Sequence, residues 1–345
     1  MLPDIIRKNE NMKSSFSKKN SKRIVYSCPY IPAEWIASHG LEPSRISPGI
    51  KERIRPIDSA AGICPYLSSF LNEANAEKNA AAVLFTTVCD QMRRAPECFG
   101  NESPLPLFLM HVPSTWKSVA AQQLYLSELQ RLSLFLIRLG GAPPSREMLS
   151  QTMMTYDKKR NALRETKGWM HPRAYSEAIA RFHRTGEVVQ NLEKSDDFIH
   201  GVPIVLIGGP LTAQDLSLFN MIQDAGGTVV LDGTETGERT MPRPFHRQYM
   251  REDPLLELAD AYFGHIPDAF RRPNSELFLW MRREFQAGYV RGVILVRNIW
   301  CDVWHAEVTR IREWLHLPLL DIDLNGENPV SRNKTRINAF LELLQ

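Results

Sequence analysis

The stretch VPIVLIGGPLTAQDLSLFNMIQDAGGTVVLDG, residues 202–233, sets the class of fold for this chain. Residues 202–210 form a short apolar run that ends in glycine and proline, as a buried strand followed by a turn does. Residues 212–225 space their apolar side chains along one face of a helix, and residues 226–233 form a second apolar run. Strand, helix and strand in this order predict a parallel β-sheet.

The same alternation continues to the end of the chain and predicts a C-terminal α/β lobe over residues 201–345. Beyond residue 233 we expect helices at 254–263, 275–288 and 302–316, strands at 291–296 and 317–324, and a terminal amphipathic helix at 331–344. Helices again separate the strands, so the sheet of this lobe is expected to be parallel throughout.

The first part of the chain repeats this pattern and predicts an N-terminal α/β lobe over residues 23–144. Its expected elements are strands at 23–32, 80–85 and 105–112 and helices at 33–41 and 118–141. Residues 145–200 show helical spacing and no strand signal, so we interpret them as a helical connector between the lobes. The fold class is therefore α/β with two parallel sheets, and a ligand is expected outside the carboxyl ends of the strands.

Composition and charge describe a globular protein with two domains. The chain has 345 residues, of which 43% are hydrophobic and 23% charged, and these values exclude a mainly disordered or fibrous chain. Of the 42 Lys and Arg residues, seven lie in residues 1–23, so residues 1–22 are expected to be a disordered basic tail. The remainder of the chain lacks the basic footprint of a nucleic-acid-binding protein.

The sequence also lacks the patterns of several protein classes. No apolar stretch approaches the roughly 20 residues that span a bilayer, and the N-terminus has no apolar core of a secretory signal. We therefore expect a cytoplasmic protein that uses neither a membrane nor a nucleic acid. Signatures of nucleotide phosphate loops, serine hydrolases, zinc proteases and thioredoxins are missing as well.

Three of the five cysteines stand where helices are expected to begin. Cys89 in TTVCDQMRRA and Cys301 in NIWCDVWHAEV each follow an apolar run, and Cys64 precedes Pro65, a residue favoured in the first turn of a helix. Helix N-termini stabilise thiolate, the form that binds metal, so we expect lowered pKa values for these thiols. If the three thiolates converge, their mutual repulsion calls for a cation or an iron–sulfur cluster.

A second interpretation of these cysteines stays open. A buried free cysteine usually acts as a small hydrophobic residue, and the spacing of the three matches neither a ferredoxin nor a paired-cysteine zinc site. The other two, Cys28 and Cys98, lack the context of strand, cysteine and helix, so we assign them to core and surface packing.

Several phrases of the chain resemble one protein family, that of 2-hydroxyacyl-CoA dehydratase and benzoyl-CoA reductase subunits, with the D-component of 2-hydroxyglutaryl-CoA dehydratase as its type. The phrases follow the order of the family and cover nearly the whole chain: YSCPYIPAEWIASHGLEPSRI (26–46), GICPYLSSFLNEA (62–74), TTVCDQMRR (86–94), RGVILVRNIWCDVWHAEV (291–308) and LPLLDIDLNGENPVSRNKTRINAFLELL (317–344).

The resemblance implies two Rossmann-like lobes and a cluster in the cleft between them. In this family three cysteines of each subunit, here Cys64, Cys89 and Cys301, hold one 4Fe-4S cluster and leave one iron open. The activity is that of a lyase of anaerobic metabolism, which eliminates water from a 2-hydroxyacyl-CoA through a one-electron ketyl radical. A homologous sister subunit in a heterodimer and a separate ATP-dependent iron–sulfur activator are the implied partners.

Further residues follow from the same resemblance. Glu34 stands in the family's Pro-x-Glu phrase and is a candidate catalytic residue, although a carboxylate at the start of a helix is also stabilised by the helix dipole. Arg239, in a Gly-x-Arg phrase, is expected to pair with an acidic residue. Tyr30, Trp300 and Trp304 either shield the cluster from water or pack in the core. The turn GGP at 208–210 either contacts a CoA phosphate or is a plain tight turn.

Other functions remain open at this point. The chain could be a subunit of an aromatic acyl-CoA reductase of the benzoyl-CoA type, or a noncatalytic subunit that relays electrons to its partner. A two-lobed nucleotide-binding protein without metal is a further alternative.

Overall fold

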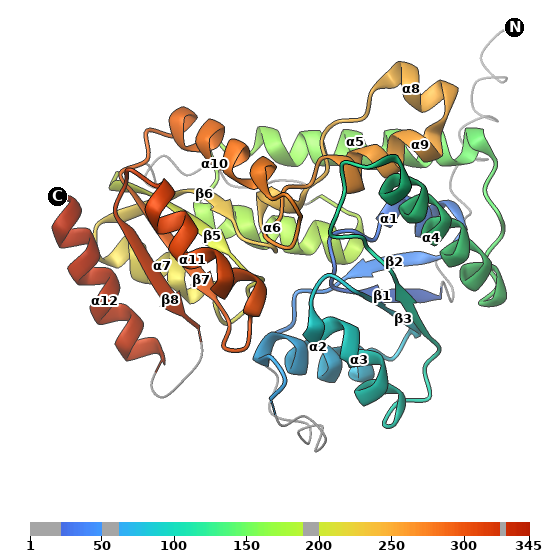
Figure 1. The fold of residues 1–345 in the computed structure, drawn as a ribbon, viewed down its shortest axis with the longest axis horizontal. Coiled ribbons are helices and arrows are strands. Elements are labelled where there is room, and N and C mark those ends of the chain that lie inside the picture. The colour runs from blue at the N-terminus through green and yellow to red at the C-terminus, as the bar shows by residue number, and fades with distance from the viewer. Residues whose placement is uncertain (1–21, 50–61, 189–199, 325–328) are drawn as a thin grey trace, which may run out of the picture.

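Two four-stranded parallel sheets form the framework of the protein (Figure 1). The computed structural model describes residues 22–49, 62–188, 200–324 and 329–345. The first sheet has the order β2-β1-β3-β4, with β1 Arg23–Tyr26, β2 Glu42–Arg45, β3 Ala80–Thr86 and β4 Leu107–Met110. The second has the order β6-β5-β7-β8, with β5 Val202–Gly208, β6 Gly227–Gly233, β7 Gly292–Arg297 and β8 Leu319–Asp323. The predicted α/β class is confirmed, and both lobes share one strand order.

Strand β2 was not expected from the sequence. Its residues, EPSR, pair in parallel register with β1, from Arg23 opposite Glu42 to Tyr26 opposite Arg45. The proline and the charged residues break the apolar pattern that marks a buried strand, so the sequence analysis did not predict β2. A proline is tolerated there because β2 lies at the edge of its sheet.

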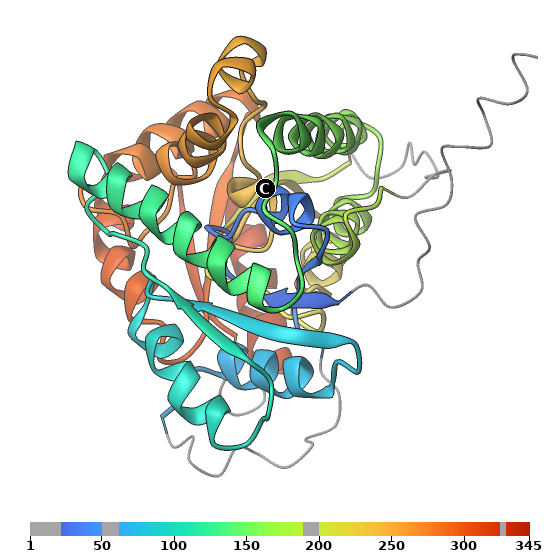
Figure 2. The same cartoon turned by 90° about the vertical axis from the view of Figure 1, so that its right-hand side faces the viewer.

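Helices cover both faces of the first sheet (Figure 2). Helices α2 and α3 pack on one face, and α1 and α4 pack on the other. Their bounds are α1 Ala33–Ser38, α2 Pro65–Ala76, α3 Asp90–Gly100 and α4 Val119–Arg138. The sheet is thus buried on both sides, which explains its short continuous apolar runs.

The second sheet is covered in the same way. Helices α7 and α12 bury one face, and α10 and α11 bury the other. Their bounds are α7 Ser217–Asp224, α10 Ser275–Ala287, α11 Asp302–Trp314 and α12 Pro329–Leu344. Helix α7 begins five residues later than expected, after a turn in which Asp215 accepts hydrogen bonds from the backbone and hydroxyl of Thr212.

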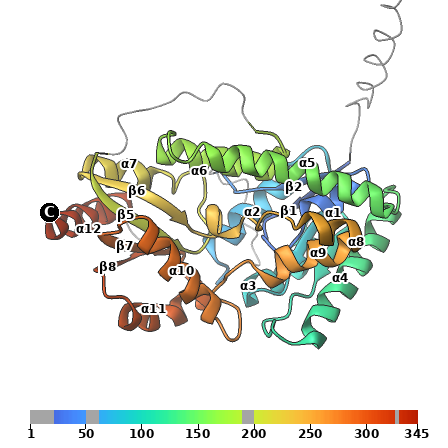
Figure 3. The ribbon, with the colours of Figure 1, turned by 90° about the horizontal axis from the view of Figure 1, so that it is seen from above.

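Two helices run alongside both lobes when the molecule is seen from above (Figure 3). They are α5 Arg146–Glu165 and α6 Pro172–Thr185. Helix α6 contacts β2 of the first sheet and β6 of the second, so it covers an edge strand in each lobe. The predicted basic tail and the last part of the predicted connector, residues 189–199, lie outside the described residues, and the domain boundaries stay predictions.

A segment from the second half of the chain completes the core of the first lobe. Helices α8 Arg247–Glu252 and α9 Pro254–Ala259, with the π-helical turn Asp260–Gly264, lie beside α1 and α4 (Figure 1). Phe245, Leu258 and Phe263 are buried in the same cluster as residues of β1 and β3. The expected helix 254–263 is thus a short α-helix followed by the π turn, and it packs across the division predicted at residue 201.

The longest described helices are α4 and α5, with 20 residues each. Both carry charged residues along their length, and no helix among the described residues is long and apolar enough to cross a membrane.

Gly208 is the last residue of β5 and lies where the loops of the two lobes meet. No side chain fits at this position. Its φ is 134°, and an added Cβ would lie 1.9 Å from the carbonyl oxygen of Val296 in the neighbouring strand β7. No small shift of the backbone relieves this overlap without separating the two strands.

We therefore expect Gly208→Ala to lower the free energy of unfolding by more than about 3 kcal/mol, measured by urea denaturation. Gly40→Ala is the matched control, because Gly40 also has a positive φ, 78°, but no atom lies within 4 Å of an added Cβ. The control is expected to cost about 1 kcal/mol, from backbone strain alone. Equal losses in the two variants would contradict the close approach of β5 and β7.

Candidate functional site

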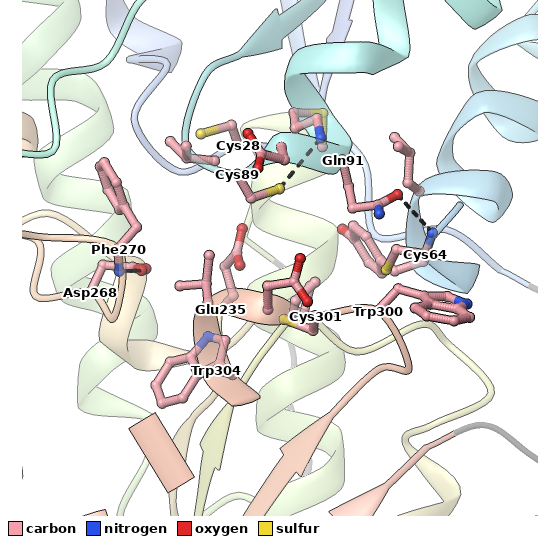
Figure 4. Close-up of a pocket in the computed structure, with 18 of the residues that line it drawn as sticks. Cys28, Cys64, Cys89, Gln91, Glu235, Asp268, Phe270, Trp300, Cys301 and Trp304 are labelled. Carbon is pink, nitrogen blue, oxygen red and sulfur yellow. Dashed lines mark hydrogen bonds between the residues drawn. The ribbon is translucent and has the colours of Figure 1, made fainter. Parts of the chain in front are cut away.

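A cavity of about 150 Å³ lies between the lobes, at the carboxyl ends of strands from both sheets (Figure 4). Its walls come from the loops after β1, β3, β5, β6 and β7 and from the start of α2. In a parallel sheet of this strand order, the loops after the first and third strands leave toward opposite faces and open a crevice. Here two such crevices meet, so one cavity is shared by both lobes.

The structure brings the three predicted cysteines to this cavity. Cys64, Cys89 and Cys301 are the residues that precede α2, α3 and α11, each at the N-cap position. Cys89 follows β3 and Cys301 follows β7, the third strand of each lobe in chain order, as their similar sequence contexts indicated. Residues more than 200 positions apart in the sequence therefore face one space.

Short contacts hold the cysteine loops in place. The backbone N–H of Met92 donates to Sγ of Cys89 at 3.4 Å, as an N-cap interaction of α3. The side chain of Gln91 accepts from the backbone N–H of Cys64 at 3.0 Å, which ties the start of α2 to the start of α3. Two of the three thiols are thus positioned relative to each other by one side chain.

Cys28 is buried in the core, as the sequence analysis assigned it, and it also lines the cavity, above Cys89 in the view of Figure 4. No helix begins directly after Cys28, so the context that marked the other three was missing. Cys98 packs with the core beneath α3 and does not line the cavity.

Burial, and not the helix dipole, dominates the acidity of these thiols. Desolvation raises the pKa of Cys89 to about 12, although the N–H of Met92 opposes the rise. Burial also raises the pKa of Cys64 and of Cys301, and for Cys301 the neighbouring thiols Cys64 and Cys89 add to the effect. The expected lowering was wrong in direction, so without a cation the three thiols are protonated at neutral pH.

The spacing of the ligand-type side chains does not suit a single metal ion. Within the described part of the chain, no three Cys, His, Asp or Glu side chains are grouped closely enough to hold one ion. Thiolates around one zinc ion, each about 2.3 Å away, must lie within about 4 Å of one another. A mononuclear site at these cysteines is therefore disfavoured, whereas a larger group would hold its ligands further apart.

Glu235, which the sequence analysis did not single out, also lines the cavity. It follows β6, and its carboxylate points toward the cysteines in Figure 4. Burial raises its pKa to about 7, the charge of Asp268 adds to the rise, and Arg239 and Arg45 oppose it. No local pattern marks such a residue, because its position depends on how the two lobes meet.

Arg239 has the acidic partner that the sequence predicted. Its buried guanidinium donates to Oδ2 of Asp268 at 2.7 Å and to the carbonyl oxygen of Gly233 at 2.8 Å. It also lies over the ring of Trp304, 5.1 Å from the ring centroid. Arg239 therefore fixes the loops beneath the cavity and does not line it.

The turn at 208–210 is bound within the protein. The N–H of Gly209 donates to the carbonyl oxygen of Val296 at 3.0 Å, and the N–H of Leu211 donates to Oγ1 of Thr236 at 3.1 Å. These donors are not available to a phosphate group, so the structure favours the tight turn. Pro210 from this turn lines the cavity.

The three predicted aromatic residues all line the cavity, in different environments. Tyr30 and Trp304 are buried, with 1% of each residue exposed, and both can exclude water. Trp300 is 55% exposed and adopts a left-handed backbone conformation with a φ of 66° directly before Cys301. Trp300 thus stands at the rim of the cavity.

Glu34 lies elsewhere. It is fully buried in α1, forms an ion pair with Arg160 of α5 and accepts a hydrogen bond from the hydroxyl of Tyr262 at 2.7 Å. It does not line the cavity that holds the cysteines. The structure gives Glu34 a role in joining α1, α5 and the π turn, and its catalytic role stays a prediction.

These features define a two-lobed parallel α/β protein with a thiol-lined cavity where the lobes meet. The family model of 2-hydroxyglutaryl-CoA dehydratase, D-component, matches residues 28–344, and the chain belongs to this family. The predicted resemblance is thereby confirmed over nearly the whole chain. A search of curated proteins found no match.

Glu34→Gln tests the structural role of this carboxylate. The substitution leaves the buried charge of Arg160 without a counter-ion, so we expect the free energy of unfolding to fall by about 3–5 kcal/mol in urea denaturation. Adding Arg160→Met removes the orphaned charge and should restore much of the loss.

The exposed pair of Lys117 and Glu276 provides the control, since Glu276→Gln should cost less than about 1 kcal/mol. If Glu34→Gln kept wild-type stability and lost activity, the carboxylate would act in catalysis and not in the fold.

Proposed function

We propose that this chain is the iron–sulfur subunit of a 2-hydroxyacyl-CoA dehydratase, a lyase that eliminates water from a 2-hydroxyacyl-CoA to give an enoyl-CoA. The family supports the dehydratase type. The observation that carries the cluster is the convergence of Cys64, Cys89 and Cys301, each an N-cap residue from a distant segment, on one cavity between the lobes.

The donor set fits a 4Fe-4S cluster. Three thiols are soft ligands of the kind that such clusters use, and their spacing does not suit a single ion. Cys64, Cys89 and Cys301 would hold the cluster. When bound, it would supply electrons one at a time at low potential, and the iron without a thiolate would act as a Lewis acid.

The residues around the cavity suit one-electron chemistry because they exclude water. Tyr30, Phe270 and Trp304 are buried and line the wall between the lobes. The hydroxyl of Tyr30 donates to the carbonyl oxygen of Ile266 at 3.1 Å, so this ring is held in place across the lobe. A dry, rigid wall protects a reactive radical from side reactions with solvent.

The family name describes one component of an enzyme, which supports a partner subunit. We propose a homologous sister subunit and a separate ATP-dependent iron–sulfur activator. The activator would supply the electron, because the sequence lacks a phosphate loop for ATP.

A second candidate function is a noncatalytic subunit that relays electrons to its partner. The size of the cavity favours this alternative, since about 150 Å³ is less than the roughly 300–1,000 Å³ of most small-molecule sites. A relay needs room for the cluster alone, whereas a dehydratase site must also admit the acyl end of the substrate.

The iron content of the purified chain tests the proposed cluster. The chain purified without oxygen should be brown and hold about four irons, and replacing Cys64, Cys89 or Cys301 by serine should remove most of the iron and the visible absorption. Cys98→Ser, outside the cavity, should keep both. Colourless wild-type protein, or cysteine variants with unchanged iron, would refute the cluster.

The products formed from a 2-hydroxyacyl-CoA test the proposed reaction. The chain with its copurifying partner, an activator, ATP and a reductant should convert a 2-hydroxyacyl-CoA into an enoyl-CoA, detected by mass spectrometry, without net consumption of reductant. Ring reduction of an aromatic acyl-CoA would instead identify a reductase of the benzoyl-CoA type. A chain with its cluster that binds no acyl-CoA and yields no product would support the electron relay.

A further inference from the structure

Glu235 places a carboxylate among the three cysteines. Figure 4 shows its side chain extending from the loop after β6 toward Cys89, with Cys301 beside it. A carboxylate close to three cysteines requires a stabilising partner, because thiolates and a carboxylate repel one another.

The main chain of Glu235 is held firmly from both lobes. Its carbonyl oxygen accepts from Nη2 of Arg45 at 2.7 Å and from Oγ1 of Thr240 at 2.8 Å. Its N–H donates to the carbonyl oxygen of Gly209 at 3.3 Å. Arg45 belongs to β2 of the first sheet, so the contact that fixes Glu235 also joins the lobes. The direction of the side chain follows from this fixed backbone.

The carboxylate itself has no partner among the described residues. Two buried carboxylates near the lobe interface have guanidinium partners: Asp268 pairs with Arg239, and Glu34 pairs with Arg160. The nearby guanidiniums are engaged elsewhere, Arg239 with Asp268 and Arg45 with backbone oxygens and Thr240. A desolvated carboxylate without a counter-ion is unfavourable, so its natural partner is a cation inside the cavity.

We propose that Glu235 is a fourth protein ligand of the cluster, which binds through a carboxylate oxygen the iron that the three thiolates leave free. The inference rests on the proposed function, because it needs the cluster. A carboxylate is a harder and more weakly held ligand of this iron than a thiolate. It closes the position in the resting protein and yields it to an incoming ligand, with no change of oxidation state.

Three substitutions of Glu235 distinguish a cluster ligand from a residue that only lies near the cluster. Glu235→Ala removes the ligand, Glu235→Gln keeps the shape without the charge, and Glu235→Cys supplies a fourth thiolate. Glu276→Gln is the control for the loss of one carboxylate charge, since Glu276 is exposed and does not line the cavity. All four are prepared anaerobically with ⁵⁷Fe, as the full chain with its copurifying partner.

The readouts are the Mössbauer spectrum and the affinity for cyanide, followed by electron paramagnetic resonance. In the wild type one iron of the four should show the signature of an oxygen ligand. Glu235→Ala should alter that signal and bind cyanide at least about tenfold more tightly, whereas Glu235→Cys should give four thiolate-bound irons that resist cyanide. Glu276→Gln should match the wild type.

Cluster loss in the Ala and Gln variants, with retention in the Cys variant, would also support ligation. Unchanged spectra and cyanide affinity in Glu235→Ala with four irons retained would overturn this inference and leave the proposed function standing. Cluster loss in all three variants would show that Glu235 supports the fold, and would overturn it as well. A wild-type chain without iron would instead refute the proposed function.

Discussion

The site depends on one constraint, the shared strand order of the two parallel sheets. In each sheet the first and third strands of the lobe are neighbours, and the loops that follow them leave toward opposite faces. Cys89 follows β3 and Cys301 follows β7, the third strand of each lobe. Because the carboxyl ends of both sheets border the same cavity, thiols more than 200 residues apart need no local sequence signal to meet.

The alternation of apolar runs and helical segments predicted the α/β class because each strand is buried on both faces. The pattern failed where an edge strand buries polar residues and where packing partners are distant in the sequence. The edge strand β2 contains Pro43 and Glu42 and so shows no apolar run. Residues 254–263 show helical spacing, but spacing cannot tell which sheet a helix covers, and these residues pack on the first lobe.

In the candidate site, too, the sequence predicted only the residues that have a local sequence signal. Cys64, Cys89 and Cys301 were found because an N-cap position is a local feature. Cys28 and Glu235 follow strands without a helix directly after them, so only the packing of the lobes brings them to the cavity. The direction of the thiol pKa values was missed for the same reason: a helix N-terminus is visible in the sequence, whereas burial is a property of the assembled fold.

The two interpretations of the cysteines are therefore compatible. Protonated and buried, a thiol packs as a small hydrophobic residue, so the protein can fold around these side chains before any cation arrives. If the proposed cluster binds, the thiols would lose their protons and become ligands. Glu235 is different, because its carboxyl group keeps polar oxygens even when it is protonated, and no described residue pairs with them, in contrast to Glu34 and Asp268. Among the side chains that line the cavity, Glu235 is therefore the strongest reason to propose that a cation binds between the lobes.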